Sequence, residues 1–245
     1  MPTYLLVAAL TLGARPWLIL ISLAGWGLLL GAVQMLSIPA YCGTFPALDS
    51  AASWAGVEQA LLFNPPRQLL SSWWLMLLAM MPLLLIHPLE HVWQRSLSRK
   101  RWQAVALFVF GFVAAWTLAG VVLMTVTVGA RVMLGLSQVT AFVAALGLGL
   151  VWQASPFKQR CLNRCHYRPR ISAFGFAFVR DCLRYGVVSG GWCIGSCWPL
   201  MLLPMLADQG HLPMMALAMG WMILERMQRA QPPRWHSPFH LRLFR

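Results

Sequence analysis

The sequence predicts an all-α fold, a polytopic membrane bundle of six transmembrane helices, and three observations lead to that prediction. Of the 245 residues, 59% are hydrophobic and only 10% are charged, against roughly 25% charged residues in an ordinary soluble domain. Runs of about twenty apolar residues, the length that crosses the hydrocarbon core of a bilayer, recur along the chain. The basic residues gather between these runs. Residues 1–245 are therefore expected to form a single integral membrane domain.

The first two crossings are expected at about 17–36 and 71–88. The first ends before Pro39, because proline cannot continue a helix. Between them lies a mildly polar connection with a candidate surface helix at 50–63. The second crossing is followed by His87-Pro88-Leu89-Glu90-His91, which we interpret as a solvated interfacial cap rather than a metal cluster.

Four further apolar stretches complete the six crossings. They are expected at about 104–126, 135–152, 185–206 and 212–228. A basic cytoplasmic loop is expected at 155–184. The last two crossings form a hairpin, and Glu225, at the end of the sixth, is expected to pair with Arg226 or another nearby arginine.

The charge pattern predicts the orientation. Every long basic segment falls on one side of a six-helix bundle, and only Arg67 and Arg131 fall on the other. Because lysine and arginine are enriched in cytoplasmic loops, both termini are expected in the cytoplasm and the protein in a bacterial inner membrane as a multi-pass chain. The net charge of +13 then reflects orientation and contact with anionic lipid headgroups, and nucleic acid is not an expected partner.

The fifth expected crossing carries the main candidate site. Cys193, Cys197, Met201 and Met205 recur every fourth residue, so a helix places them on one face. Glycines flank this face and would let a neighbouring backbone approach closely; they are Gly186, Gly190, Gly191 and Gly195.

The chain is also methionine-rich on the neighbouring crossings. The sixth carries a matching row of potential soft ligands, and Met76 and Met80 repeat the spacing in the second. The row on the sixth crossing is His211, Met215, Met219 and Met222. Methionine is a routine filler of apolar helices, so these rows alone indicate packing at least as well as metal binding.

A second cysteine pair, Cys161 and Cys165, stands in the basic segment and is followed at once by His166. If helical, the two thiols face one way, although zinc knuckles use a shorter C-x2-C spacing. The surrounding basic residues are expected to lower the thiol pKa values and favour thiolate. Two cysteines on an interfacial helix with no ligand remain an alternative. Both pairs could share one site only if residues 155–184 fold back against the fifth crossing.

Soft sulfur donors select soft ions, Cu(I) first and zinc second. Binding would release thiol protons and offset the cost of holding a cation in low dielectric. The predicted metal ligands are Cys161, Cys165, Cys193, Cys197, Met201 and His166.

These segments also resemble a known family. The stretch from Gln153 to Pro169, the stretch from Gly186 to Met201, and the phrase WLMLLAMMP in the second crossing are similar to a bacterial domain-of-unknown-function family described as predicted metal-binding integral membrane proteins. The likeness covers about residues 70–228. Members often carry paired cysteines where this chain has Ser196-Cys197, so a trithiolate on the fifth crossing is not expected. The resemblance implies a membrane fold and a bound metal.

Three functions are compatible with these patterns. The first is a metal-binding membrane protein that handles, delivers or transports copper. Its expected partners are the lipid bilayer and either another membrane protein or a metal chaperone. The second is a non-catalytic subunit or assembly factor of a larger membrane complex. The third is a membrane thiol-disulfide oxidoreductase, which is disfavoured because helical residues four apart hold Cβ atoms about 5–6 Å apart, whereas a disulfide needs about 3.5–4.5 Å. The sequence offers no phosphate loop and no convincing nucleophile, so no catalytic residue and no enzymatic activity are predicted.

Overall fold

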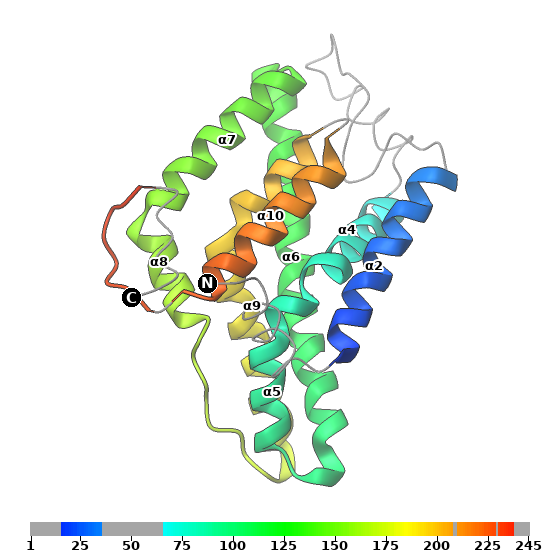
Figure 1. The fold of residues 1–245 in the computed structure, drawn as a ribbon, viewed down its shortest axis with the longest axis vertical. Helices are drawn as coiled ribbons and strands as arrows, with labels where there is room; N and C mark the ends of the chain where they lie inside the picture. Colours follow the sequence, from blue (N-terminus) through cyan, green and yellow to red (C-terminus); the bar gives the residue numbers. More distant parts are fainter. Residues whose placement is uncertain (1–15, 36–65, 208–209, 229, 238–245) are drawn as a thin grey trace, which may run out of the picture. The chain divides into compact units, whose positions relative to one another are not determined.

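The structure is a computed structural model that describes residues 16–35, 66–207, 210–228 and 230–237. All regular elements within these ranges are helices, which confirms the all-α prediction for this part of the chain (Figure 1). The candidate surface helix at 50–63, and Cys42 on the same connection, lie outside the described residues.

The helices follow one another along the chain with short connections. In order they are α2 Pro16–Met35, α4 Pro66–Met80, η1 Pro82–Leu85, α5 Ile86–Arg95, η2 Ser98–Lys100, α6 Arg101–Leu134, α7 Gln138–Ala154, α8 Pro156–Arg164, α9 Gly175–Leu206 and α10 His211–Arg226.

Several of these helices can cross a membrane. Among the described residues, Ser98–Ala130 and Gly175–Leu206 are long and apolar enough to do so. Two bent pairs raise the number to four if each pair is one span: Arg67–Met80 with Pro82–Arg95, and Val139–Ala154 with Pro156–Arg164. The number of six crossings, and the single membrane domain, stay predictions.

The second expected crossing is not one straight helix. It bends by 55° between α4 and the following segment, at Pro82, which cannot donate a helical hydrogen bond. Pro88 does not end the crossing, because it lies in the first turn of α5, where proline is tolerated, and α5 continues to Arg95. The solvated-cap interpretation stays a prediction for His87, which is exposed. It is wrong for His91, which is buried and donates from Nε2 to the Pro169 carbonyl at 2.9 Å.

The expected loop at 155–184 is largely helical. Ser155 caps α8 by accepting a hydrogen bond from the Lys158 backbone N–H, and Pro156 occupies the first turn, two strong signals for a helix start. Gly175, with a φ of +67°, begins α9. Only residues 165–174 separate the two helices, and the cytoplasmic location of this segment stays a prediction.

The chain divides into two compact units. Unit 1 comprises Met1–Ser37, Trp74–Ala114 and His166–Gly190, and unit 2 comprises Ile38–Trp73, Ala115–Cys165 and Gly191–Arg245.

Unit 1 is organised by a close approach between α6 and α9. A Cβ added at Gly186 would overlap the Phe108 carbonyl oxygen, and one added at Gly111 would overlap the Leu183 carbonyl oxygen. Phe108 is fully buried beside Tyr185, with ring centroids 5.0 Å apart. The predicted close backbone approach is therefore confirmed at Gly186, since only glycine leaves room for it.

Unit 2 holds α7, α8, α10 and the C-terminal half of α9. Trp73 is fully buried, donates from Nε1 to the Trp116 carbonyl at 3.0 Å, and fills the space beside Gly120. A separate apolar cluster joins α7 to the end of α9. Its buried members are Ala141, Ala145, Leu203 and Leu206. This packing fixes the end of α9 against α7, next to the candidate site.

The variant Gly186→Ala is expected to destabilise the protein by about 1–3 kcal/mol, because the added methyl group overpacks the helix contact. The matched control is Gly191→Ala on the same helix, where an added Cβ meets nothing within 4 Å. Thermal unfolding in detergent measures both, and equal stability of the two variants would contradict the assigned packing.

Candidate metal centre

The sulfur row on α9 faces the interior of unit 2. Cys193 and Cys197 are 1% and 2% exposed, and Met201 and Met205 are also buried. The two Sγ atoms lie 3.9 Å apart, and the Cys197 thiol donates to the Cys193 carbonyl at 2.8 Å. Two thiolates bound tetrahedrally to one ion at bond lengths near 2.3 Å would lie about 3.8 Å apart. The predicted thiol pair therefore has a spacing that one metal ion can bridge.

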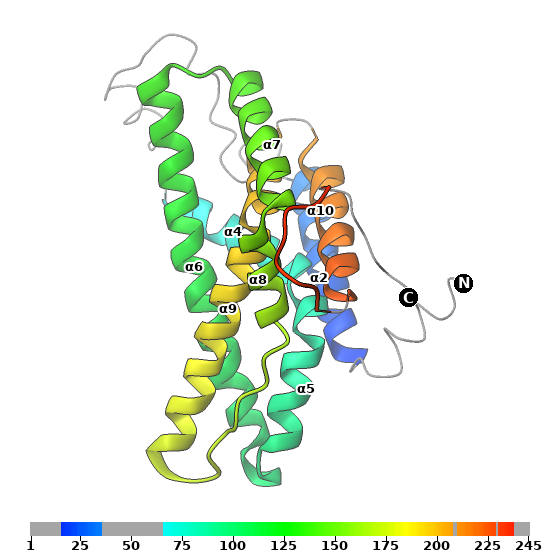
Figure 2. The same cartoon turned by 90° about the vertical axis from the view of Figure 1, so that its left-hand side faces the viewer.

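The second cysteine pair lies against the first. Cys165 is buried, with its Sγ 3.9 Å from the Oγ of Ser196, the residue between Cys193 and Cys197 that follows Gly195. Cys161 is half-buried, and its Sγ would lie 2.7 Å from a Cβ at Gly195. One turn further, the Arg164 guanidinium stacks over the Trp192 ring at 4.5 Å. The segment after α7 thus folds back, as a shared site requires, and Figure 2 shows α8 beside α9.

Gly195 allows this contact for two reasons. It has no side chain, so the Cys161 thiol can occupy the surface of α9. Its carbonyl has no helical partner four residues on, because Pro199 lacks an N–H, and the Trp152 indole donates to it instead at 3.1 Å. The expected approach of a backbone is wrong here and at Gly191: a thiol approaches Gly195, and Gly191 faces open space.

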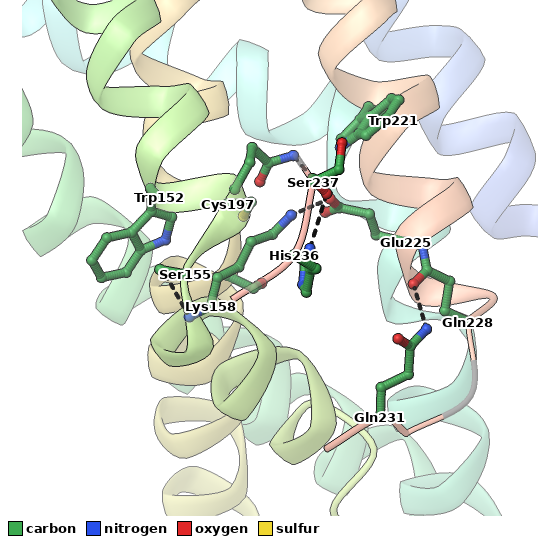
Figure 3. Close-up of polar contacts among 12 residues, drawn as sticks. Trp152, Ser155, Lys158, Cys197, Trp221, Glu225, Gln228, Gln231, His236 and Ser237 are labelled. Atoms are coloured by element: carbon green, nitrogen blue, oxygen red, sulfur yellow. Dashed lines mark hydrogen bonds and ion pairs between the residues drawn. The ribbon is translucent and has the colours of Figure 1, made fainter. Parts of the chain in front are cut away.

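A buried ion pair holds α8 against α10. Lys158 and Glu225 are each 5% exposed and form a salt bridge (Figure 3). The same carboxylate oxygen accepts hydrogen bonds from Gln153 Nε2 at 2.9 Å and Trp221 Nε1 at 2.6 Å. The prediction that Glu225 pairs with an arginine is therefore wrong. Lys158 was not predicted as part of the site.

The last described residues return to α8. Asn163 donates from Nδ2 to the Gln231 carbonyl at 2.7 Å and accepts from the Gln231 backbone N–H at 3.2 Å. The His236 backbone N–H donates to the Ala154 carbonyl at 3.3 Å. The segment after α10 thus fixes both ends of α8.

Three cations act on the four thiols, and the first is the Arg164 guanidinium, which interacts with Cys161. The Arg226 guanidinium interacts electrostatically with Cys165, Cys193 and Cys197, and the Lys158 ammonium interacts with Cys197. The sequence carries a signal for Glu225 that could have revealed this arrangement. The chain has only six acidic residues, and an acidic residue at the end of an apolar helix needs a cationic partner.

The electrostatics of Cys165 differ from the prediction. Burial raises the pKa of its thiol to about 11, with the neighbouring Cys193 and Cys161 adding to the increase and Arg226 opposing it. Burial outweighs the nearby positive charge, so the prediction of a lowered pKa is wrong for the Cys165 thiol. Cys165 therefore stays protonated at neutral pH until a metal displaces its proton.

The remaining predicted ligands differ in position. Met201 is fully buried one turn beyond Cys197, whereas His166 is exposed and belongs to unit 1. All cysteines within the described part of the chain are free thiols. Across the same residues, no three side chains of His, Cys, Asp or Glu group closely enough to hold a metal ion together. The geometry thus resembles a two-thiol site with further thiols nearby, not a preformed site with three or more such ligands.

Fold and site together define an α-helical protein with helices able to cross a membrane and a buried cluster of soft donors. The family model described as "PpoB2: Copper chaperone" matches residues 70–239, and the chain belongs to this family. The match covers the region of the resemblance at 70–228, but the family is described by a function rather than as one of unknown function. No curated protein and no solved structure matches the chain.

The raised pKa of Cys165 predicts a distinctive alkylation profile. In metal-free protein its reaction rate with iodoacetamide should increase about tenfold per pH unit from pH 7 to 10, because thiolate is the reactive form and its fraction grows until the pKa near 11 is reached. Site-resolved mass spectrometry gives the rate. An unperturbed thiol would level off near pH 8.5, and a plateau there would contradict the assigned burial.

The ion pair predicts an asymmetric double-variant cycle. Lys158→Met leaves the Glu225 carboxylate buried without its cation and should cost about 3–5 kcal/mol of stability. Combining Lys158→Met with Glu225→Gln removes both charges and should recover a large part of that loss. Thermal unfolding in detergent measures the cycle, and additive losses would show that the two groups do not interact.

Proposed function

We propose that the chain is a membrane-embedded copper-handling protein that takes up Cu(I) with its two CxxxC pairs and delivers it to a partner. The observation that carries this proposal is that the second cysteine pair packs against the helix that carries the first: Cys161 lies at Gly195 and Cys165 at Ser196, beside the Cys193–Cys197 pair with its 3.9 Å thiol spacing. Membership of a family described as copper chaperones supports copper as the cargo. Soft thiolate and thioether donors favour Cu(I) over harder ions.

The charges around the site favour Cu(I) over zinc. Lys158, Glu225 and Arg226 leave one net positive charge near the Cys193–Cys197 pair. A Cu(I) ion with these two thiolates carries one net negative charge, which this surplus neutralises. Zinc with the same two thiolates is neutral and leaves the surplus uncompensated. Because uncompensated charge is costly in a low-dielectric interior, the two-thiolate Cu(I) complex fits best.

The burial of the thiols suggests the order of transfer. Cys161 is half-buried and the most accessible of the four, Cys165 is buried, and Cys193 and Cys197 are almost fully enclosed. An incoming ion would meet Cys161 first and pass inward by exchange of thiolate ligands. Copper stays Cu(I) throughout, and each thiol that binds releases a proton that it regains when the ion leaves. The proposal includes no catalysis.

The proposed setting is the inner membrane of a bacterium. Six crossings with both termini in the cytoplasm are proposed from the distribution of arginine and lysine, and in that orientation Cys161 lies at the cytoplasmic end of the path. A partner, either a copper-requiring protein or a soluble metal chaperone, would exchange copper with one of its two ends.

Purified protein should carry about one Cu(I) per thiol cluster after anaerobic loading. Cys193→Ser should lower the affinity for that ion by more than about 100-fold, since changes outside the ligand shell alone lower metal affinity 10–100-fold. Competition with a chromophoric Cu(I) chelator measures the affinity. The matched control is Cys182→Ser, which removes a buried thiol from unit 1 outside both pairs.

Two outcomes would contradict the proposal. Equal weakening by Cys182→Ser and Cys193→Ser would show a general effect of thiol loss rather than a site. Fully folded protein that takes up no Cu(I) under these conditions would exclude copper binding altogether.

A further inference from the structure

A buried histidine lies beyond the thiol cluster, where α9 ends and α10 begins. His211, the first residue of α10, is 8% exposed. Its Nδ1 lies 2.8 Å from the Pro204 carbonyl oxygen, which also accepts from the Ala207 backbone N–H at 3.3 Å. A carbonyl can only accept, so Nδ1 carries the proton and Nε2 carries the lone pair.

The other ring nitrogen is Nε2. It is buried and has no hydrogen-bond partner among the residues that the structure describes. A buried acceptor without a partner is unfavourable, and a bound cation would remove that cost. In metal sites, a ligating histidine usually donates its other N–H to a backbone carbonyl, which fixes the tautomer. His211 already has that arrangement, with Nε2 as the free donor atom.

Buried methionines on α9 and α10 supply further soft donors. Met215 follows His211 by one turn on the same face of α10 and is fully buried. On α9, Met201 and Met205 continue the row of Cys193 and Cys197 toward Pro204, to which His211 is bonded. Thioether sulfur and imidazole nitrogen together suit Cu(I).

We propose that His211 Nε2 and the Met215 thioether form a second Cu(I) site, separate from the thiols and reached from them along Met201 and Met205. This inference rests on the proposed copper function and adds a release site to it. The ligands are neutral, so the ion keeps its positive charge here and is held less tightly than by thiolates. As the ion moves outward, the two thiolates of α9 regain their two protons, and copper stays Cu(I).

The test uses a full-length variant with all six cysteines replaced by serine, so that only non-thiol sites remain. Titration with Cu(I) against a chromophoric chelator should detect about one ion per chain. Adding His211→Asn should weaken it at least tenfold, while the asparagine amide can still donate to the Pro204 carbonyl and preserve the helix end. His236→Asn, which changes a histidine outside α10, is the matched control and should retain the ion.

A second measurement covers the case in which the cysteine-free chain does not fold. In the otherwise unchanged protein, His211→Asn should lower the number of bound Cu(I) ions by one and leave the thiol-dependent ion in place. His211→Met, which restores a soft donor, should recover the lost ion.

The outcomes separate this inference from the proposed function. Copper binding that depends on Cys193 but is unchanged by His211→Asn overturns the second site and leaves the thiol site standing. Loss of the ion in His236→Asn as well as in His211→Asn also overturns the assignment. Absence of Cu(I) binding in every folded variant, including the unchanged chain, contradicts both.

Discussion

The site depends on the close approach of α8 to α9 at Gly195. Glycine at this position leaves room for the Cys161 thiol, because it has no side chain. The carbonyl at the same position is freed by Pro199 and accepts from Trp152. The approach brings a cysteine pair from outside the apolar stretch of α9 onto the pair within it. Without it, the chain would have two separate CxxxC helices, and an ion could not pass from one cysteine pair to the other by exchange of thiolate ligands.

A buried ion pair helps to position α8 for its contact with α9. The Lys158–Glu225 ion pair crosses from α8 to α10, and Gln153 and Trp221 satisfy the same carboxylate oxygen. Such a pair adds little to net stability compared with an apolar replacement, because desolvation offsets the attraction. The ion pair fixes the position of α8 against α10. Together with Arg226, it leaves one net positive charge near Cys193 and Cys197, which suits a two-thiolate Cu(I) complex.

Much of the helical fold follows from the sequence. The apolar runs predict the positions of α2, α7 and α10 to within a few residues, whereas α6 ends later and α9 begins earlier than expected. The four-residue spacing predicts that Cys193, Cys197 and Met201 share one buried face. The second crossing was harder, since Pro82 bends it and Pro88 is tolerated within the first turn of α5. The basic composition of residues 156–164 suggests a loop, although Ser155-Pro156 is a strong signal for the start of a helix.

The candidate site could be predicted only in part. Spacing along one helix gives a row of thiols, but it cannot show whether another helix joins it, because that depends on a fold-back of α8 that is fixed by tertiary contacts. The partner of Glu225 and the raised pKa of Cys165 depend on the same contacts. The family match makes copper the expected cargo, and the geometry indicates how these thiols could hold it.

The most direct test of a single shared thiol site is X-ray absorption at the copper edge of the Cu(I)-loaded protein. We compare the unchanged chain with Gly195→Ala, which pushes the Cys161 thiol away from α9 but removes no sulfur, and with Gly191→Ala on the same helix. The account predicts a sulfur shell for the unchanged chain and for Gly191→Ala, and an altered shell with weaker copper binding for Gly195→Ala. Identical spectra and affinities for all three proteins, or a shell of nitrogen and oxygen alone, would contradict it.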